Sequence, residues 1–508
     1  MLKILILFFL IIGVSFRLYL TANNNFLFNM DNARDFVDVR EIVVLHKARL
    51  IGPTSAIEGV YNGPAWYYLL AVPFVLTNGN PYGAILMEIF LWVIGGFFLF
   101  KLCKNYGYLI LSFVGFVWVY SNYIVLTNLY SFNPNPVTLL SPLFIYLLKR
   151  YLETNKLIFS ISVFLLGGLF FNFEMNFGIF VLPIIFLSVI LSQKTNFLKT
   201  KIFWIGFSFF ILTLLPQLFF DLRHNFIMTN SLLRFIATPS TPGKLFNLTI
   251  QITSTFEKFF NVFAPTFFNL QLLTKILIFL FIISLFKFLK TSSLKKDLTI
   301  LISILMIVVP FLGYIILPVS VNSWHLGAET VAFIILSAFT LNQFRNWSLL
   351  GKIISYSICF FIIFYVLWDF TNSFSLHKPK SMDVSNIDNE IAAVDYVFQK
   401  AEGKNFKVYI YLPSIMDYPY QYLFWWRGLE KYGYVPKDYA YLPGMPPYIS
   451  NKEKLPMGSN PPDSNLIFLI KEPDRIKIRH LWENSFTKYP LIKSEWVGPI
   501  LIETRKEI

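Results

Sequence analysis

Four charged side chains follow one another at helical spacing near the start of the chain, at Asp31, Arg34, Asp35 and Asp38. Residues three and four positions apart lie on one face of a helix, so these groups would be neighbours. A carboxylate can take a proton from an attacking hydroxyl, and a guanidinium can hold a phosphate through paired hydrogen bonds. The pattern predicts acid–base chemistry beside a phosphate, with Asp31 as the first candidate for the base and Asp35 as the second.

A simpler structural role is open to the same residues. Asp31 precedes a helical pattern that runs to about Ala48, where it would cap the helix by accepting backbone N–H bonds. Arg34 and Arg40 would pair with Asp38 and other acids on a wet surface, which contributes little stability. Because the segment carries more charge than a cap requires, we favour catalysis, with Arg34 or Arg40 as a phosphate ligand.

The composition indicates what must position these groups. The chain has 508 residues, of which 56% are hydrophobic and 14% charged, and Phe occurs 57 times. Several runs exceed the roughly 18 apolar residues that cross a bilayer, so we predict an α-helical polytopic membrane protein. The net charge of +14 does not indicate a nucleic-acid partner, because Lys and Arg are dispersed between the apolar runs. Cys103 and Cys359 lie far apart and predict no disulfide framework.

Hydropathy and charge together predict about eleven membrane spans. With the N-terminus cytoplasmic, roughly thirteen Lys and Arg fall in the inner loops against about two acids, as the positive-inside rule expects. The first span has no clear small-x-small cleavage site and carries Arg17 near its far end, so we expect an uncleaved anchor. The predicted spans lie near residues 3–20, 82–101, 107–125, 137–149, 157–171, 178–192, 202–219, 272–289, 298–317, 326–343 and 353–370.

An odd number of spans places the chain from about residue 371 outside the cytoplasm. Its composition changes there, and Pro and Tyr become frequent. Residues 388–400 have helical spacing, whereas 407–412 and 465–470 are typical of short strands. We therefore predict a small extracytoplasmic α/β domain over residues 371–508, following a transmembrane domain over residues 1–370.

Long predicted loops share the outer side with this domain, over residues 21–81, 221–270 and 319–325. We expect the active site in the loop of residues 21–81. Its stretch Leu69–Leu76 is too short to span a bilayer, so we expect it to lie along the outer surface as the floor of a lipid-facing pocket.

Other polar residues stand at predicted outer span ends. Arg223 and His224 would either anchor the interface or bind an anionic head group. Glu174 lies between two asparagines, so it would either be neutral and capped by them or bind substrate. His325 follows Trp324, and because the two distant histidines have no ligand spacing, we expect no metal site.

Several motifs in this order resemble those of one family. They are the Asp-containing helix after the first span, Gly63-Pro64-x-x-Tyr67-Tyr68, Asn133-Pro134-Asn135, and Pro216 to His224. The chain resembles the protein mannosyltransferase and aminoarabinose transferase superfamily, which are membrane glycosyltransferases of the GT-C type. Members take a sugar from a polyprenyl phosphate on the extracytoplasmic side, so the resemblance implies a prokaryotic cell-membrane protein.

The resemblance also assigns roles to residues. Asp31 matches the proposed base of the family, and Arg34 and Arg40 match basic positions of the same helix. Two motifs depart from the usual pattern, since relatives often have Asp-Glu at Asp31-Asn32 and Lys-Pro at Gly63-Pro64. In place of the missing lysine, Arg223, His224 and Lys47 are candidate ligands of the donor phosphate. The candidates for binding the sugar or the acceptor are Glu174, Asn133, Tyr67 and His325.

We therefore predict a glycosyltransferase that uses one displacement, with inversion, at an acceptor hydroxyl of unassigned identity. A polyprenyl phosphate is already a good leaving group, so one carboxylate and one or two cations suffice and we expect no cofactor. Two alternatives are a transporter or flippase of lipid-linked sugars, and a non-catalytic anchoring protein. A flippase would place polar groups near the bilayer midplane, whereas here they gather at one mouth.

Overall fold

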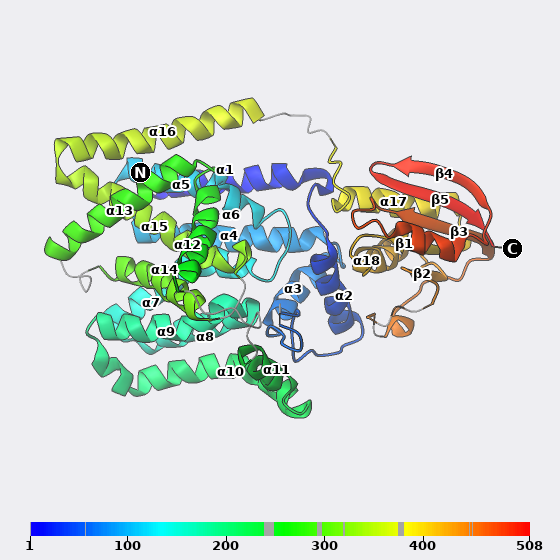
Figure 1. Cartoon of the computed structure of the whole chain (residues 1–508), viewed down its shortest axis with the longest axis horizontal. Coiled ribbons are helices and arrows are strands. Elements are labelled where there is room, and N and C mark those ends of the chain that lie inside the picture. The colour runs from blue at the N-terminus through cyan, green and yellow to red at the C-terminus, as the bar shows by residue number, and fades with distance from the viewer. Residues whose placement is uncertain are drawn as a thin grey trace.

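The computed structural model describes residues 2–55, 57–237, 248–291, 297–317, 321–373, 380–444, 446, 448–449 and 451–507. A bundle of long helices forms one end of the molecule, and a small sheet domain forms the other (Figure 1). Helices α2 (Met30–Val44) and α3 (Ala65–Leu76) lie between the two parts.

All eleven predicted spans are helical in the structure. Eight helical segments of the described chain are long and apolar enough to cross a membrane, which makes this an integral membrane protein. Helices α8 and α9 are shorter, and α7 carries charges near its end. The span helices are α1 (Leu2–Thr21), α4 (Tyr82–Cys103), α5 (Tyr108–Tyr120), α7 (Asn135–Thr154), α8 (Leu157–Phe173), α9 (Met175–Leu191), α10 (Lys201–Arg223), α13 (Gln271–Thr291), α14 (Leu298–Ile316), α15 (Gly327–Trp347) and α16 (Leu349–Ser373).

Helix α15 is the central helix of the bundle, because nearly all of its side chains are buried by neighbouring helices. The other long helices surround it and expose apolar side chains, as a lipid-facing layer does. Much of the predicted outer segment at 221–270 is helical and forms α11 (Ile227–Ala237) and α12 (Leu248–Thr266). A short helix, α6 (Asn122–Leu126), follows α5.

The C-terminal part is a five-stranded sheet with helices, as predicted. The strand order is β2-β1-β3-β5-β4, with β1 parallel to β2 and β3 and with β5 antiparallel to its neighbours. The predicted helix and both predicted strands are confirmed as α17, β1 and β3. The elements are α17 (Ile387–Lys400), β1 (Asn405–Tyr411), α18 (Tyr418–Arg427), β2 (Asp438–Ala440), β3 (Asp463–Lys471), α19 (Arg479–Glu483), β4 (Leu491–Val497) and β5 (Ile500–Lys506).

The sheet domain is joined to the segment that follows α1. Backbone bonds run from Ile387 N to Phe26 O at 3.0 Å and from Phe28 N to Ser385 O at 2.8 Å, forming an antiparallel bridge. Helix α18 packs against α2, and the indole of Trp426 donates to Asn78 O at 3.1 Å. We call the contact between α2 and the sheet domain the domain joint. It fixes α2 between the membrane bundle and the sheet.

Candidate active site on helix α2

Helix α2 begins at an asparagine cap, which places Asp31 in its first turn. The side chain of Asn29 accepts from Asp31 N at 3.0 Å and Asn32 N at 3.4 Å, while Asn32 Oδ1 accepts from Asn29 N at 3.1 Å. This reciprocal capping box satisfies the first donors of the helix. The capping role considered for Asp31 is therefore wrong, because Asn29 fills it. The carboxylate of Asp31 remains available for other contacts.

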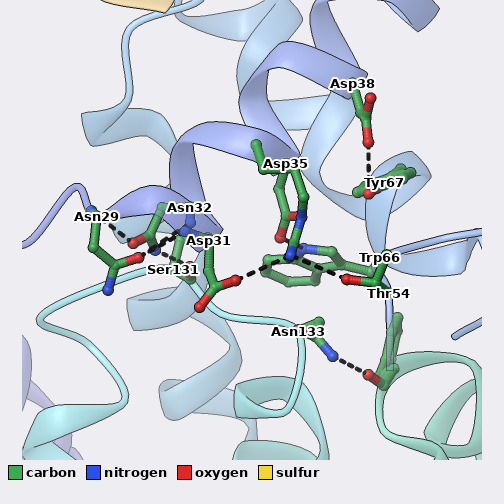
Figure 2. Close-up of polar contacts among 12 residues, drawn as sticks. Asn29, Asp31, Asn32, Asp35, Asp38, Thr54, Trp66, Tyr67, Ser131 and Asn133 are labelled. Atoms are coloured by element: carbon green, nitrogen blue, oxygen red, sulfur yellow. Dashed lines mark hydrogen bonds and ion pairs between the residues drawn. The ribbon is translucent and has the colours of Figure 1, made fainter. Parts of the chain in front are cut away.

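Arg34 joins two of the predicted acids. Its Nη1 lies 3.0 Å from Asp31 Oδ1, and its Nη2 lies 3.0 Å from Asp35 Oδ1. Figure 2 shows Asp31 and Asp35 on the same side of α2, with Trp66 and Thr54 beside them. Arg34 Nη1 also lies 3.5 Å from Thr54 Oγ1. The three charged groups form a triad, Asp31–Arg34–Asp35, in which 41% of the Asp31 side chain is exposed and 15% of Arg34.

Asp35 differs from Asp31 in its surroundings. It is 1% exposed, and its oxygens accept from Arg34 and from the indole of Trp66, which donates at 2.7 Å. Burial raises the pKa of Asp35 to about 6, although Arg34 and the Trp66 hydrogen bond act in the opposite direction. Both oxygens of Asp35 are therefore engaged in holding Arg34 and Trp66. Asp31 is the more exposed of the two carboxylates.

Asp38 belongs to a second set of contacts on α2. Tyr67 donates its hydroxyl to Asp38 Oδ2 at 2.7 Å (Figure 2). Arg49 pairs with Asp38 Oδ1 at 2.7 Å. Arg49 also lies 3.2 Å from Glu41. Tyr67 is 1% exposed, so its hydroxyl is buried against Asp38. The structure places this predicted sugar or acceptor ligand within the packing between α2 and α3.

The loop after α6 contacts both α2 and the membrane bundle. Asn32 donates through Nδ2 to Ser131 O, and Asn133 donates through Nδ2 to Phe173 O at 2.6 Å (Figure 2). Tyr130, in the same loop, is near enough to Asp31 to interact with it electrostatically. The predicted residue Asn133 is buried and holds the loop to the end of α8. The loop forms one wall beside Asp31.

Glu174 and His325 are brought together by Asn176, although they are far apart in sequence. The amide of Asn176 donates to Glu174 Oε1 at 2.7 Å and lies 3.1 Å from His325 Nε2, while His325 Nδ1 accepts from Asn322 N at 3.2 Å. Both predicted residues are buried. The capping by Asn176 that was one alternative for Glu174 is present, and Asn172 turns instead to Gly168 O and Thr213 O.

Sequence reasoning missed Glu329, which lies close to this group. Glu329 interacts electrostatically with Glu174 and with the hydroxyls of Tyr123 and Tyr314. Neither of its carboxylate oxygens has a hydrogen-bond partner among the described residues. A lone acid in an otherwise apolar span was the available signal, because such residues are costly in a membrane and mark functional sites.

Four predicted phosphate ligands are not assembled around Asp31. Arg40 is fully buried at the domain joint, where it donates to Gln421 O at 3.2 Å, and Lys47 donates to Asn451. Arg223 and His224 are exposed at the end of α10, and His224 stacks on Phe220 with ring centres 4.0 Å apart. The contacts of these four residues lie away from Asp31, so their role as ligands of the donor phosphate stays a prediction. Helical spacing carried no information about contacts from the sheet domain.

An apolar cavity of about 260 Å³ lies near the loop between α2 and α3. Val60 borders it, and a bridge between Thr54 and Tyr61 connects that segment back to Arg34. Gln217 ties the wall to the loop by donating to Tyr61 O at 3.0 Å. The remaining lining is mostly apolar, from Phe171, Met175, Leu214, Leu218, Asp221, Met228, Thr229 and Leu232. The cavity therefore offers an apolar surface that is linked to the triad through Thr54 and Tyr61.

Metal ligands do not cluster in the described part of the chain, where no three His, Cys, Asp or Glu side chains gather at a suitable site. The groups available for chemistry at α2 are thus carboxylates, guanidinium groups and the indole and phenol donors that hold them. The expectation that the protein needs no metal stays a prediction.

Two solved structures share this arrangement over nearly the whole chain. They are the crystal structures of ArnT from Cupriavidus metallidurans bound to undecaprenyl phosphate, with a TM-score of 0.59, and in the apo state, with a TM-score of 0.57. Each covers 97% of this chain and 97% of ArnT at 9% sequence identity. The chain has the ArnT fold.

This likeness confirms the predicted fold class, a GT-C membrane bundle with a small C-terminal sheet domain. No protein-family profile and no curated protein sequence matches the chain. At 9% identity the likeness to ArnT establishes the fold alone. The roles of individual residues must be argued from the contacts around α2.

Proposed function

We propose that this protein is a membrane glycosyltransferase that moves a sugar from a polyprenyl phosphate to an acceptor hydroxyl, with inversion. The observation that carries the proposal is the triad on α2, in which a partly exposed Asp31 and a buried Asp35 flank Arg34. The fold shared with ArnT supports the class of reaction, since ArnT has been crystallised with undecaprenyl phosphate. The apolar cavity that Val60 borders supports a donor with a long hydrocarbon chain.

The triad couples deprotonation of the acceptor hydroxyl to departure of the phosphate in a single displacement. Asp31 takes the proton of the acceptor hydroxyl as its oxygen forms a bond to the anomeric carbon, and the bond from that carbon to the phosphate oxygen breaks. The bonding electrons leave with the phosphate, which gains negative charge. Because Asp31 becomes neutral in the same step, the charge of Arg34 is freed to stabilise the departing phosphate. Asp35 keeps Arg34 in position throughout.

The proposed orientation places the N-terminus in the cytoplasm and the sheet domain outside a prokaryotic cell. A cysteine introduced at Ser414, which is exposed on the sheet domain, should react with an impermeant maleimide on intact cells. Lys194 is exposed just after the C-terminal end of α9, which we place in the cytoplasm. A cysteine introduced there should react only after lysis. Both native cysteines are buried, so they add little background. If only Lys194→Cys is labelled on intact cells, the protein has the opposite orientation to the one proposed.

Transfer itself is tested with the full chain reconstituted in vesicles that contain labelled polyprenyl-phosphate sugars. We expect Asp31→Asn to reduce transfer by about 10²–10⁴-fold, the usual worth of a general base. Asp388→Asn is the matched control, because Asp388 is an exposed carboxylate of the sheet domain that pairs with Lys380. Equal transfer by Asp31→Asn and wild type would overturn the assignment. Label that crosses the bilayer without transfer would favour a flippase.

A further inference from the structure

The domain joint contains buried hydrogen-bond donors that have no acceptor. Arg40 is fully buried, and its Nε and Nη2 have no partner among the described residues. The indole nitrogen of Trp425 and the hydroxyl of Tyr439 are also buried without partners there. A buried donor that bonds to nothing costs about 1–3 kcal/mol, and more when it is charged. Such a concentration in one place requires an explanation.

These groups come from three elements that meet at one place. The Arg40 guanidinium of α2 lies 5.1 Å from the ring centre of Trp425, and its Nη1 donates to the carbonyl of Gln421. Trp425 follows Gln421 by one turn of α18, so both side chains share a face. The Gln421 amide donates to Tyr439 O at 2.7 Å, and Arg40 interacts electrostatically with Tyr439. The unpaired donors therefore surround a common region.

A second cation, Lys452, lies in the same region as Arg40. Lys452 donates to Tyr439 O at 2.6 Å and lies 3.4 Å from the centre of that ring. Lys452 and Arg40 repel each other, and burial lowers the pKa of Lys452 to about 8. Arg40 forms no ion pair with a described carboxylate, since Asp417 accepts from Tyr448 and Gln421 while Asp38 pairs with Arg49. Asp38 and Glu41 act electrostatically on Arg40, and Asp417 and Asp438 act on Lys452, without forming an ion pair with either cation among the described residues.

The numbers of unpaired donors and acceptors indicate what kind of ligand would fit this region. Among the described residues, the unpaired donors outnumber the one unpaired acceptor of this region, Gln421 Oε1. A water molecule would donate as well as accept, whereas an anion would only accept and would also neutralise Arg40. The surrounding side chains are buried, which restricts the occupant to a small ion. We propose that the domain joint binds a small inorganic monoanion such as chloride, held by Arg40, Trp425 and Tyr439.

The anion would fasten the sheet domain to α2, between one and three turns of the helix beyond the triad. It is independent of the proposed reaction, because it is held by the far end of the helix and by α18. The full chain in detergent is unfolded thermally in sodium chloride or sodium bromide at constant ionic strength, with gluconate making up the balance. We expect the midpoint to rise and saturate as chloride or bromide replaces gluconate. Bromide should give an anomalous diffraction peak between Arg40, Trp425 and Tyr439.

Two adjacent tryptophans provide a matched pair of variants. Trp425→Phe removes an unpaired donor and should raise the half-saturating chloride concentration about tenfold, as expected for a lost bond to a charged group. Trp426→Phe removes a donor that is already paired with Asn78 O, so it should lower the midpoint equally at every chloride concentration. Identical half-saturation in Trp425→Phe and wild type would overturn the proposal. A joint without a bromide peak, filled by water only, would also overturn it.

Discussion

Arg34 and Arg40 lie on one helix but have opposite surroundings. Arg34 is near the exposed start of α2 and is flanked by two carboxylates, whereas Arg40 is buried near its end and has none among the described residues. A guanidinium between two carboxylates is already organised and responds when one of them takes a proton. A guanidinium enclosed by aromatic rings and backbone instead fixes the packing of two domains. The chemistry of an arginine is thus set by its neighbours.

Replacing each arginine by glutamine gives the largest expected contrast. Arg34→Gln should reduce transfer by about 10²–10³-fold, the usual cost of removing one preorganised donor to developing charge. Arg40→Gln should leave transfer per folded molecule near wild type and lower stability by about 2–3 kcal/mol, from one charged hydrogen bond and one cation–π contact. Turnover and thermal unfolding of both variants measure this difference. If Arg34→Gln and Arg40→Gln lose turnover equally, both arginines act in the same site.

The pH dependence of stability separates the two acids that hold Arg34. Burial raises the pKa of Asp35 from 3.8 to about 6, so between these values the folded protein binds more protons than the unfolded chain. Stability should therefore be greatest below pH 3.8 as far as Asp35 is concerned, and should fall by about 3 kcal/mol as the pH rises to about 6.

Asp35→Asn should remove this decline, whereas the exposed control Asp388→Asn should keep it. Thermal midpoints between pH 4 and pH 7 measure the effect. If Asp35→Asn and wild type lose stability in parallel, another buried acid is responsible. Glu472 is the group to examine next, because burial raises its pKa to about 7.

The smallest expected effect distinguishes packing from substrate binding at Tyr67. Tyr67→Phe removes one hydroxyl from Asp38, which Arg49 still pairs, so we expect a loss of about 1 kcal/mol in stability. Transfer should change little, because the hydroxyl is buried. A KM that rises tenfold or more for the donor or acceptor, without loss of stability, would restore the predicted role of Tyr67 in binding. Tyr68→Phe is the adjacent control, since its hydroxyl donates to Arg49 O.

Local patterns predicted the elements of this molecule well. Runs of apolar residues are long enough to identify spans, and spacing of three and four residues identified the face of α2 that carries Asp31, Arg34 and Asp35. The cap was assigned two residues too late, because Asn29 and Asp31 are both suitable capping residues. Sequence alone does not show which of two closely spaced capping residues begins the helix.

Contacts between distant segments account for the residues that were misplaced. Arg40 was expected beside Arg34 because both are basic residues of one helix, yet α18 from the other end of the chain covers Arg40. Glu329 was overlooked since its neighbours, Glu174 and Tyr123, belong to other helices. Both errors concern tertiary packing, which periodicity along one helix does not encode.

The bridge between Phe28 and Ser385 has a consequence for how the protein is made. The nearby side chains of Asn25 and Asn386 bond to each other across 361 positions of sequence. The ribosome must therefore add most of the polypeptide before the segment after α1 can pair with Ser385 and Ile387. Helix α2 emerges early during synthesis, whereas its contacts with α18 can form only after residue 427 has been made.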